Sequence, residues 1–232
     1  MRYNIDSVVA NVYCHYMDLT NITAETAYTL GFIWADGSIS KENKIKIAIK
    51  QVDAVIIEPT LMKAWNWNIR RNIQKTNPPG QLQMSFQKGS VELATKLISY
   101  NYRSKDQAPT ILSIIPENLT HYWWRGYSDG DGCFCISRDG HCSYSICGPY
   151  TQDWSAFEKL VLPMEIHYRI GREINKKTGH KGSRIVIPSI CGGYKFGNYI
   201  YQGFLEDRIG LTRKYEKYLQ FNLPRNERRR PA

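Results

Sequence analysis

The chain has 232 residues, of which 42% are hydrophobic and 22% are charged, so its composition supports a folded core and excludes a disordered chain. The formal net charge of +10 favours a polyanionic partner, with nucleic acid first and an anionic membrane surface second, although a basic surface can also serve solubility alone. No stretch approaches the ~18 apolar residues of a membrane span, and the N-terminus lacks a signal-peptide pattern, so we expect an intracellular protein.

The first predicted helix covers residues 22–35, "ITAETAYTLGFIWA", which contain several good helix formers and no proline. Asn21 or Thr23 is suited to cap its N-terminus, because short polar side chains accept hydrogen bonds from free backbone N–H groups. We expect the helix to stop at Asp36-Gly37.

Two strands of the first half are predicted from strict alternation of side chains. In residues 44–50, "KIKIAIK", the isoleucines share one face, while the lysines and one alanine share the other. Residues 81–87, "QLQMSFQ", alternate in the same way, with Leu82, Met84 and Phe86 turned inward and the glutamines turned outward. Each strand is therefore predicted to be half-buried, with a polar outer face.

A further strand and two helices complete the first half. A helix is predicted at residues 53–65, with Asp53 as a candidate cap and with Pro59 delaying its start or bending it. Residues 68–75 are the predicted hairpin partner of the second alternating strand, and residues 90–100 form another helix.

The second half repeats this order. Pro116 suits a first helical turn, and Asn118 or Thr120 suits the cap of the same helix. The predicted elements are a helix at 116–130, strands at 133–137 and 142–147 around an Asp139-Gly140 turn, a helix at 151–162, strands at 168–174 and 183–190, and helices at 194–204 and 211–221.

The chain is therefore predicted to be an internal duplication with a period of about 95 residues, which is too long for a solenoid. The predicted fold class is α+β, with two pseudo-symmetric subdomains. The predicted boundaries are an N-terminal subdomain at 1–105, a linker at 106–115, a C-terminal subdomain at 116–223 and a basic tail at 224–232.

Four of the six cysteines lie within residues 133–147, "CFCISRDGHCSYSIC", which raises the alternative of a zinc site. In a hairpin, Cys142 and Cys147 differ in parity and point to opposite faces, so the four thiols cannot close one tetrahedral site. Reduced strand cysteines of an intracellular protein are the favoured interpretation.

Small residues recur four positions apart in both helices that end at Asp-Gly. Gly31 and Ala35 form one pair, and Gly126 and Gly130 form the other, so each pair lies on a single helix face. Glycine in a helix interior costs about 1 kcal/mol relative to alanine, and close approach of a second helix is the natural reason to accept that cost. We therefore expect the two small faces to pack on each other.

Packing of the two helices would bring Asp36 and Asp131 together at their ends. Two carboxylates at close range repel each other, and a divalent cation relieves the repulsion; hard oxygen ligands suit Mg²⁺. Paired aspartates that hold metal beside a basic surface are typical of phosphodiester cleavage. The alternative is that each Asp-Gly is an ordinary helix end and turn in a purely structural duplication.

The segments "TLGFIWADG", residues 29–37, and "WRGYSDGDG", residues 124–132, resemble the two motif copies that name the LAGLIDADG homing endonucleases. Two motifs in one chain resemble the monomeric class, and the likeness covers essentially the whole sequence. It implies two αββαββα subdomains with the motif helices at their interface and antiparallel saddle-shaped sheets facing the DNA major groove. It also implies an intron-encoded nuclease that makes Mg²⁺-dependent double-strand breaks, with Mn²⁺ as a substitute, and leaves 3′ overhangs at a long site.

The resemblance also implies site residues. Asp36 and Asp131, the last acids of the motifs, correspond to metal ligands, and the backbone carbonyls of Ala35 and Gly130 assist them. Trp34 departs from the motif, which usually has a small acid or an aliphatic residue there.

Further catalytic residues of the family are polar or basic. Gln51 matches the polar residue near the end of the second strand, whereas the corresponding place in the second half is near Gly148 and departs from the pattern. Lys214, with Arg213 as the next choice, and Lys105 match the basic residue near the end of each subdomain.

DNA contacts are predicted from the outer faces of the alternating strands, where Lys and Arg neutralise phosphates or read guanine, and Gln and Asn read adenine. The predicted contacts are Lys44, Lys46, Lys50, Asn68, Arg70, Asn72, Gln74, Gln81, Gln83 and Gln87 in the first half, and Ser143, Ser145, Arg169, Glu173 and Arg184 in the second.

The expected partner is double-stranded DNA, bound by a monomer. Two alternatives on the same fold stay open: an RNA-binding maturase for a host intron, and a DNA-binding protein without catalysis. A structural or protein-binding domain fits the charge and the Gln/Lys strand faces less well.

Overall fold

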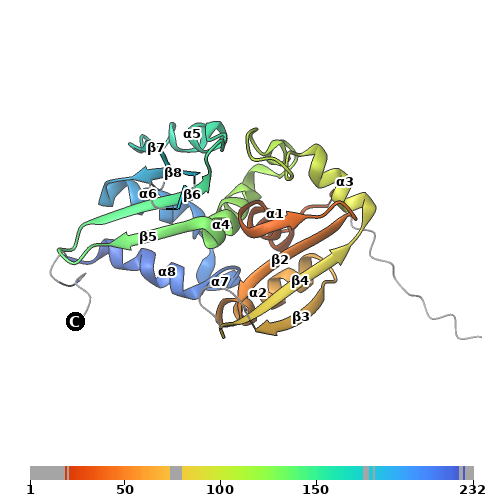
Figure 1. Ribbon diagram of the computed structural model, residues 1–232. Helices are drawn as coiled ribbons and strands as arrows, with labels where there is room; N and C mark the ends of the chain where they lie inside the picture. The colour runs from red at the N-terminus through yellow and green to blue at the C-terminus, as the bar shows by residue number, and fades with distance from the viewer. Residues whose placement is uncertain are drawn as a thin grey trace, which may run out of the picture.

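The computed structural model describes residues 19, 21–73, 80–174, 178–179, 181–224 and 227. Within these residues the chain forms two halves, each with a four-stranded antiparallel sheet. In Figure 1 the two sheets lie on either side of a central pair of helices. No helix in the described part of the chain is long and apolar enough to span a bilayer.

The first half has the order αββαββα. Its elements are α1 (Ala24–Asp36), β1 (Gly37–Ile39), β2 (Lys44–Lys50), α2 (Gln51–Ala64), β3 (Asn68–Ile73), β4 (Leu82–Gly89) and α3 (Val91–Ser99).

The second half repeats this order and adds two short helices. Its elements are α4 (Thr120–Asp131), β5 (Gly132–Ile136), β6 (Cys142–Pro149), α5 (Ser155–Val161), β7 (Arg169–Ile174), β8 (Lys181–Ile187), α6 (Ile190–Ile200), α7 (Phe204–Asp207) and α8 (Thr212–Leu219). Short 3₁₀ turns cover Thr110–Ser113, Glu117–Leu119 and Gln220–Asn222.

The two sheets have the same strand order. The first is β1-β2-β4-β3 and the second is β5-β6-β8-β7, with every neighbouring pair antiparallel. The predicted α+β duplication is therefore confirmed, and so are the two helices that stop at Asp-Gly.

Alternation of side chains is confirmed most clearly in β2, where Ile45, Ile47 and Ile49 are buried and every intervening residue is exposed. The prediction for Leu82 is wrong, because this first residue of β4 is 52% exposed. Ser85 lies on the same outer face as the glutamines of β4 but is buried, and the amides of Asn72 and Gln87 donate to its hydroxyl.

The predicted cap of the first motif helix is confirmed, whereas that of the second is wrong. Thr23 caps α1, with its hydroxyl accepting from Thr26 N at 3.2 Å. Neither candidate caps α4: a 3₁₀ turn precedes it, and Thr120 is its first residue.

Helix α2 also differs from the prediction. It starts at Gln51, directly after β2, so Asp53 lies within its first turn instead of capping it, and Pro59 lies inside the helix without delaying its start. In the second half, β8 ends early and Ser189 caps α6, with its hydroxyl accepting from Gly192 N at 3.0 Å.

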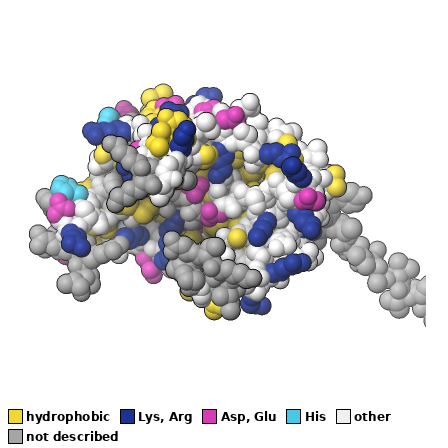
Figure 2. Space-filling view, viewed as in Figure 1, with side chains coloured by type: hydrophobic (Ala, Val, Ile, Leu, Met, Phe, Trp, Pro, Cys, Tyr) yellow, Lys and Arg dark blue, Asp and Glu magenta, His cyan; other side chains and the backbone are white. Residues whose placement is uncertain are grey.

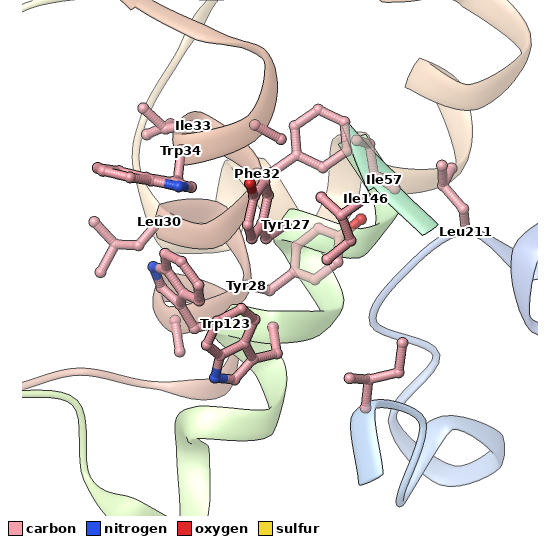
Figure 3. Packing of buried hydrophobic residues seen from close by; sticks show 14 of the residues in the cluster. Tyr28, Leu30, Phe32, Ile33, Trp34, Ile57, Trp123, Tyr127, Ile146 and Leu211 are labelled. Carbon is pink, nitrogen blue, oxygen red and sulfur yellow. The ribbon is translucent and has the colours of Figure 1, made fainter. Parts of the chain in front are cut away.

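The two halves of the molecule meet at the contact between α1 and α4. A Cβ added to Gly31 would lie 1.9 Å from the carbonyl oxygen of Trp123, and one added to Gly126 would lie 2.0 Å from that of Tyr28. The two backbones therefore touch, as the small-residue pattern predicts. Figure 3 shows aromatic side chains of both helices, including Trp34, packed around this contact.

Trp34, the departure from the motif, is buried. Its ring meets Tyr102 edge-on with centroids 5.2 Å apart, and Trp123 of α4 lies 6.2 Å away. This large side chain fills the space between α1 and the segment that leads to the second half.

We predict that Gly126→Ala destabilises the protein by about 3 kcal/mol, because its methyl group would overlap a backbone carbonyl of the facing helix and neither helix can move aside cheaply. Urea denaturation followed by tryptophan fluorescence measures the change. Gly89→Ala is the matched control, since no atom lies within 4 Å of its added Cβ. Equal stability of the two variants would contradict the proposed backbone contact.

Candidate active site

The site lies where the two motif helices end. Gly37 and Gly132 follow the helices in extended conformation, and their N–H groups donate to the carbonyls of Ile33 and Ser128. The chain therefore passes directly from each helix into the first strand of its sheet, with an aspartate at the joint.

The two joints touch each other. A Cβ added to Gly130 would lie 2.2 Å from the Ala35 Cβ and 3.2 Å from Asp36 Oδ2. The helix contact therefore brings Asp36 close to the last turn of α4, which carries Asp131.

Burial disfavours the charged forms of both carboxyl groups, and the charge of Asp131 adds to this effect at Asp36. Burial, followed by the charge of Asp131, raises the pKa of Asp36 to about 6, while the two nearby lysines act against the rise. Burial also raises the pKa of Asp131. Asp36 nevertheless keeps access to solvent, through an open hollow of about 640 Å³ that both halves line.

Lys105 connects the two joints. Its Nζ donates to the carbonyl of Ala35 at 2.8 Å and lies 3.7 Å from Asp131 Oδ2. Burial lowers the pKa of this lysine, and the charges of Asp131 and Asp36 oppose that effect.

Lys214 occupies the equivalent position in the second half. Its buried Nζ donates to the carbonyls of Asp129 at 2.6 Å and of Ser128 and Gly132 at 2.8 Å, and lies 3.5 Å from that of Gly130. Burial lowers its pKa. Each half thus directs one lysine to the C-terminal carbonyls of its own motif helix.

Gln51 is not among the residues that line the hollow at Asp36. It is the first residue of α2 and lines an apolar hollow with Val52, Val55 and Leu82. Gly148 lies in β6, where an added Cβ would lie 3.0 Å from Gln152 Oε1.

The outer face of the first sheet is a regular polar array. Gln87 of β4 lies between Lys46 of β2 and Asn68 of β3. Gln83 lies in the same way between Lys50 and Asn72. Arg70 and the exposed Lys44 lie on the same face, and Gln81 lies just before β4. Gln74 lies outside the described residues.

The outer face of the second sheet carries less free positive charge. Ser143, Ser145 and Arg169 lie on it, and Arg184 Nη2 donates to Glu173 Oε1 at 2.9 Å. Figure 2 shows Lys and Arg side chains more densely on the side of the first sheet, with acidic side chains near the middle of this view.

No family model matches the sequence, and no curated protein matches it. Solved structures do match. The I-SmaMI LAGLIDADG homing endonuclease bound to cleaved DNA is 15% identical, with a TM-score of 0.50 over 87% of this chain and 88% of that one. I-WcaI bound to its DNA recognition sequence is 14% identical, with a TM-score of 0.50 over 86% and 87% of the chains. I-DmoI in complex with DNA and Ca is 14% identical, with a TM-score of 0.50 over 78% and 90%.

The chain has the LAGLIDADG homing endonuclease fold. Similarity at 14–15% identity establishes the fold and leaves the chemistry of this chain to be argued from its own residues. In the LAGLIDADG fold of this chain, the two motif helices are α1 and α4.

The oxygen atoms at the joint fit a hard divalent cation. Two carboxylates, Asp36 and Asp131, lie near backbone carbonyls, and a nearby cation would favour the charged forms that burial disfavours. Within the described residues, no three His, Cys, Asp or Glu side chains form a ligand cluster. A cation would therefore draw its remaining ligands from water or phosphate.

Sequence reasoning missed an ion pair between the halves of the LAGLIDADG fold. Arg213 Nε and Nη2 donate to the two oxygens of Asp53 at 2.6 and 2.7 Å, and the Asp53 side chain is only 7% exposed. Arg213, the next choice to Lys214 as the basic residue near the end of the second subdomain, instead holds α8 against α2 through this ion pair. Nothing in the sequence links residues so far apart.

Asp129, the acid just before the motif's end, joins three segments. It is buried, accepts from Tyr28 OH at 2.9 Å and from Leu211 N at 2.8 Å, and lies 3.3 Å from Tyr201 OH. These contacts indicate a structural role.

Arg125 is the second missed residue. It is fully buried and donates to the carbonyls of Ile200, Gln202 and Ile209 and to Asp207. Its position among the aromatics of "WWRGY" was the available signal, because a charge there needs buried partners.

We predict that the free energy of unfolding of the metal-free wild type falls as pH rises through the acidic range, and that Asp36→Asn abolishes this fall. Because the folded pKa of about 6 exceeds the ordinary value near 4, the folded state holds a proton that the unfolded state has released between those pH values. The free energy of unfolding therefore falls from about pH 4 to about pH 6. Urea titrations in EDTA across this window measure it, and identical profiles for wild type and variant would contradict the raised pKa.

We predict that Arg213→Met lowers the free energy of unfolding by about 2 kcal/mol, because it leaves the buried Asp53 carboxylate without its charged donor. Urea denaturation provides the measurement, and Arg138→Met, at an exposed arginine, is the control. Adding Asp53→Asn to Arg213→Met should recover part of the loss. Strictly additive effects would rule out the direct coupling.

Proposed function

We propose that the chain is a site-specific endodeoxyribonuclease that makes a divalent-cation-dependent double-strand break with 3′ overhangs at a long DNA target. The observation that carries this proposal is the meeting of two motif carboxylates at the junction of two outward-facing sheets. Two neighbouring carboxyl groups whose ionisation is unfavourable are expected where a cation binds.

Asp36 and Asp131 would hold the cation, with the carbonyls of Ala35 and Gly130 beside them. When bound, Mg²⁺ or its substitute Mn²⁺ would polarise the scissile phosphate and lower the pKa of a bound water. Lys105, within 3.7 Å of Asp131, adds fixed positive charge where phosphate charge develops.

Lys214 has the same role in the second half, supported by four carbonyl contacts. The family role of Gln51 has weaker support, because this side chain lines a different hollow. The proposed chemistry therefore rests on two acids and two lysines.

The outer faces of the sheets would bind DNA on either side of the junction. The rows of Lys, Gln and Asn on the first sheet combine phosphate neutralisation with base reading. One chain supplies both halves, so a monomer is sufficient, and the unlike outer faces suit an asymmetric target. The solved structures of this fold in complex with DNA support such a partner.

We predict that Mg²⁺ supports cleavage of a plasmid library with a randomised target region, and that Asp36→Asn and Asp131→Asn each lower the rate by about 10²-fold or more. Sequencing of the cut ends identifies the site and the overhang. Glu206→Gln, at an exposed carboxylate of α7, is the matched control.

Absence of cutting with any divalent metal, together with tight binding to one DNA site, would contradict the nuclease proposal and indicate a DNA-binding protein without catalysis. Tight binding to an intron RNA instead would indicate a maturase. In the nuclease case, DNA affinity should fall steeply with salt, because each neutralised phosphate releases counterions.

A further inference from the structure

Two thiols face outward on β5, immediately after the second motif. Cys133 and Cys135 flank the inward-facing Phe134, both are exposed, and their sulfur atoms lie 3.1 Å apart. The equivalent positions after the first motif are Ser38 and Ser40, so the second half alone has this pair.

The strand that carries the thiols lies at the edge of its sheet. Among the described strands β5 pairs only with β6, and Figure 1 shows it at the margin of the second sheet. A strand rises about 3.2–3.4 Å per residue, so the Cα atoms of residues two apart are separated by about 6.4–6.8 Å. That separation is at the upper end of the range that a disulfide spans.

A bond between these thiols would therefore need a small local contraction of an edge strand. A disulfide that is strained and exposed is the kind that reductants open readily. Both features suit reversible oxidation better than a permanent structural link.

We propose that Cys133 and Cys135 form a dithiol site that hydroperoxides oxidise reversibly to an intramolecular disulfide. With hydrogen peroxide, one thiol attacks a peroxide oxygen, an S–O bond forms as the O–O bond breaks, and water leaves. The second thiol attacks the resulting sulfenic sulfur, the S–S bond forms, and a second water leaves. The two sulfurs lose two electrons in total, hydrogen peroxide gains them, and a thiol reductant reverses the change.

Oxidation would act on the candidate active site through the backbone. Strand β5 starts at Gly132, directly after Asp131, and the Gly132 carbonyl accepts from Lys214 Nζ at 2.8 Å. The hollow beside the thiols is lined by Lys214 and Lys217 of α8. Contraction of β5 would displace Gly132 and its neighbours, so oxidation should slow cleavage; this consequence rests on the proposed nuclease function.

The first test concerns the dithiol alone and needs no DNA. The full chain is treated with a stoichiometric amount of hydrogen peroxide, alkylated with N-ethylmaleimide and digested with trypsin. The peptide covering residues 126–138 contains Cys133 and Cys135 as its only cysteines. We expect it to be lighter by two hydrogens and unalkylated, and dithiothreitol to restore double alkylation.

Double alkylation after peroxide, conversion to sulfinic acid, or a link to another cysteine would overturn the dithiol site. Cys135→Ser, which introduces the residue type found in the first half, should lose the product. Cys191→Ser, at an exposed cysteine of α6, should keep it.

The second test measures cleavage of the identified target before and after peroxide, with each protein compared with itself. Wild type and Cys191→Ser should slow at least tenfold and recover with dithiothreitol, whereas Cys133→Ser and Cys135→Ser should not respond. A disulfide without a rate change would overturn control of the site. If neither form cleaves DNA, the nuclease proposal fails, and the mass measurement still decides the dithiol.

Discussion

Backbone contact between α1 and α4 determines where everything else in the molecule lies. Added Cβ atoms at Gly31 and Gly126 would come within 2.0 Å of carbonyl oxygens on the opposite helix, so only glycine allows this approach. The contact fixes the distance between the helix ends, and each end leads directly into a sheet. The position of both aspartates and the placement of both sheets therefore follow from one packing interaction.

The same contact creates an electrostatic cost. It places two carboxylates near each other at helix C-termini, where the helix dipoles also disfavour negative charge. Lys105 and Lys214 offset part of this cost by donating to the terminal carbonyls. The close approach of the two helices fixes where these acids lie.

Features with a local signal could be predicted from the sequence. Alternation identified β2 and β4, and glycine spacing identified the helix contact, because both patterns repeat over a few residues. The burial of Leu82 was predicted wrongly because alternation shows which face a side chain is on but not where the core ends along a strand. The Asp53–Arg213 ion pair could not be predicted, since it depends on how α8 folds back onto the first half.

The helix contact and the outer faces of the sheets differ in how freely they accept substitutions. A side chain added at Gly31 would need a simultaneous change in the opposite helix, whereas an outward residue such as Lys46 projects into solvent. Descendants of such a duplicated chain can therefore exchange their surface residues one at a time around an unchanged centre. The two outer faces of this chain differ in this respect: one is rich in Lys and Gln, and the other carries Ser, Cys and an Arg184 that is paired with Glu173.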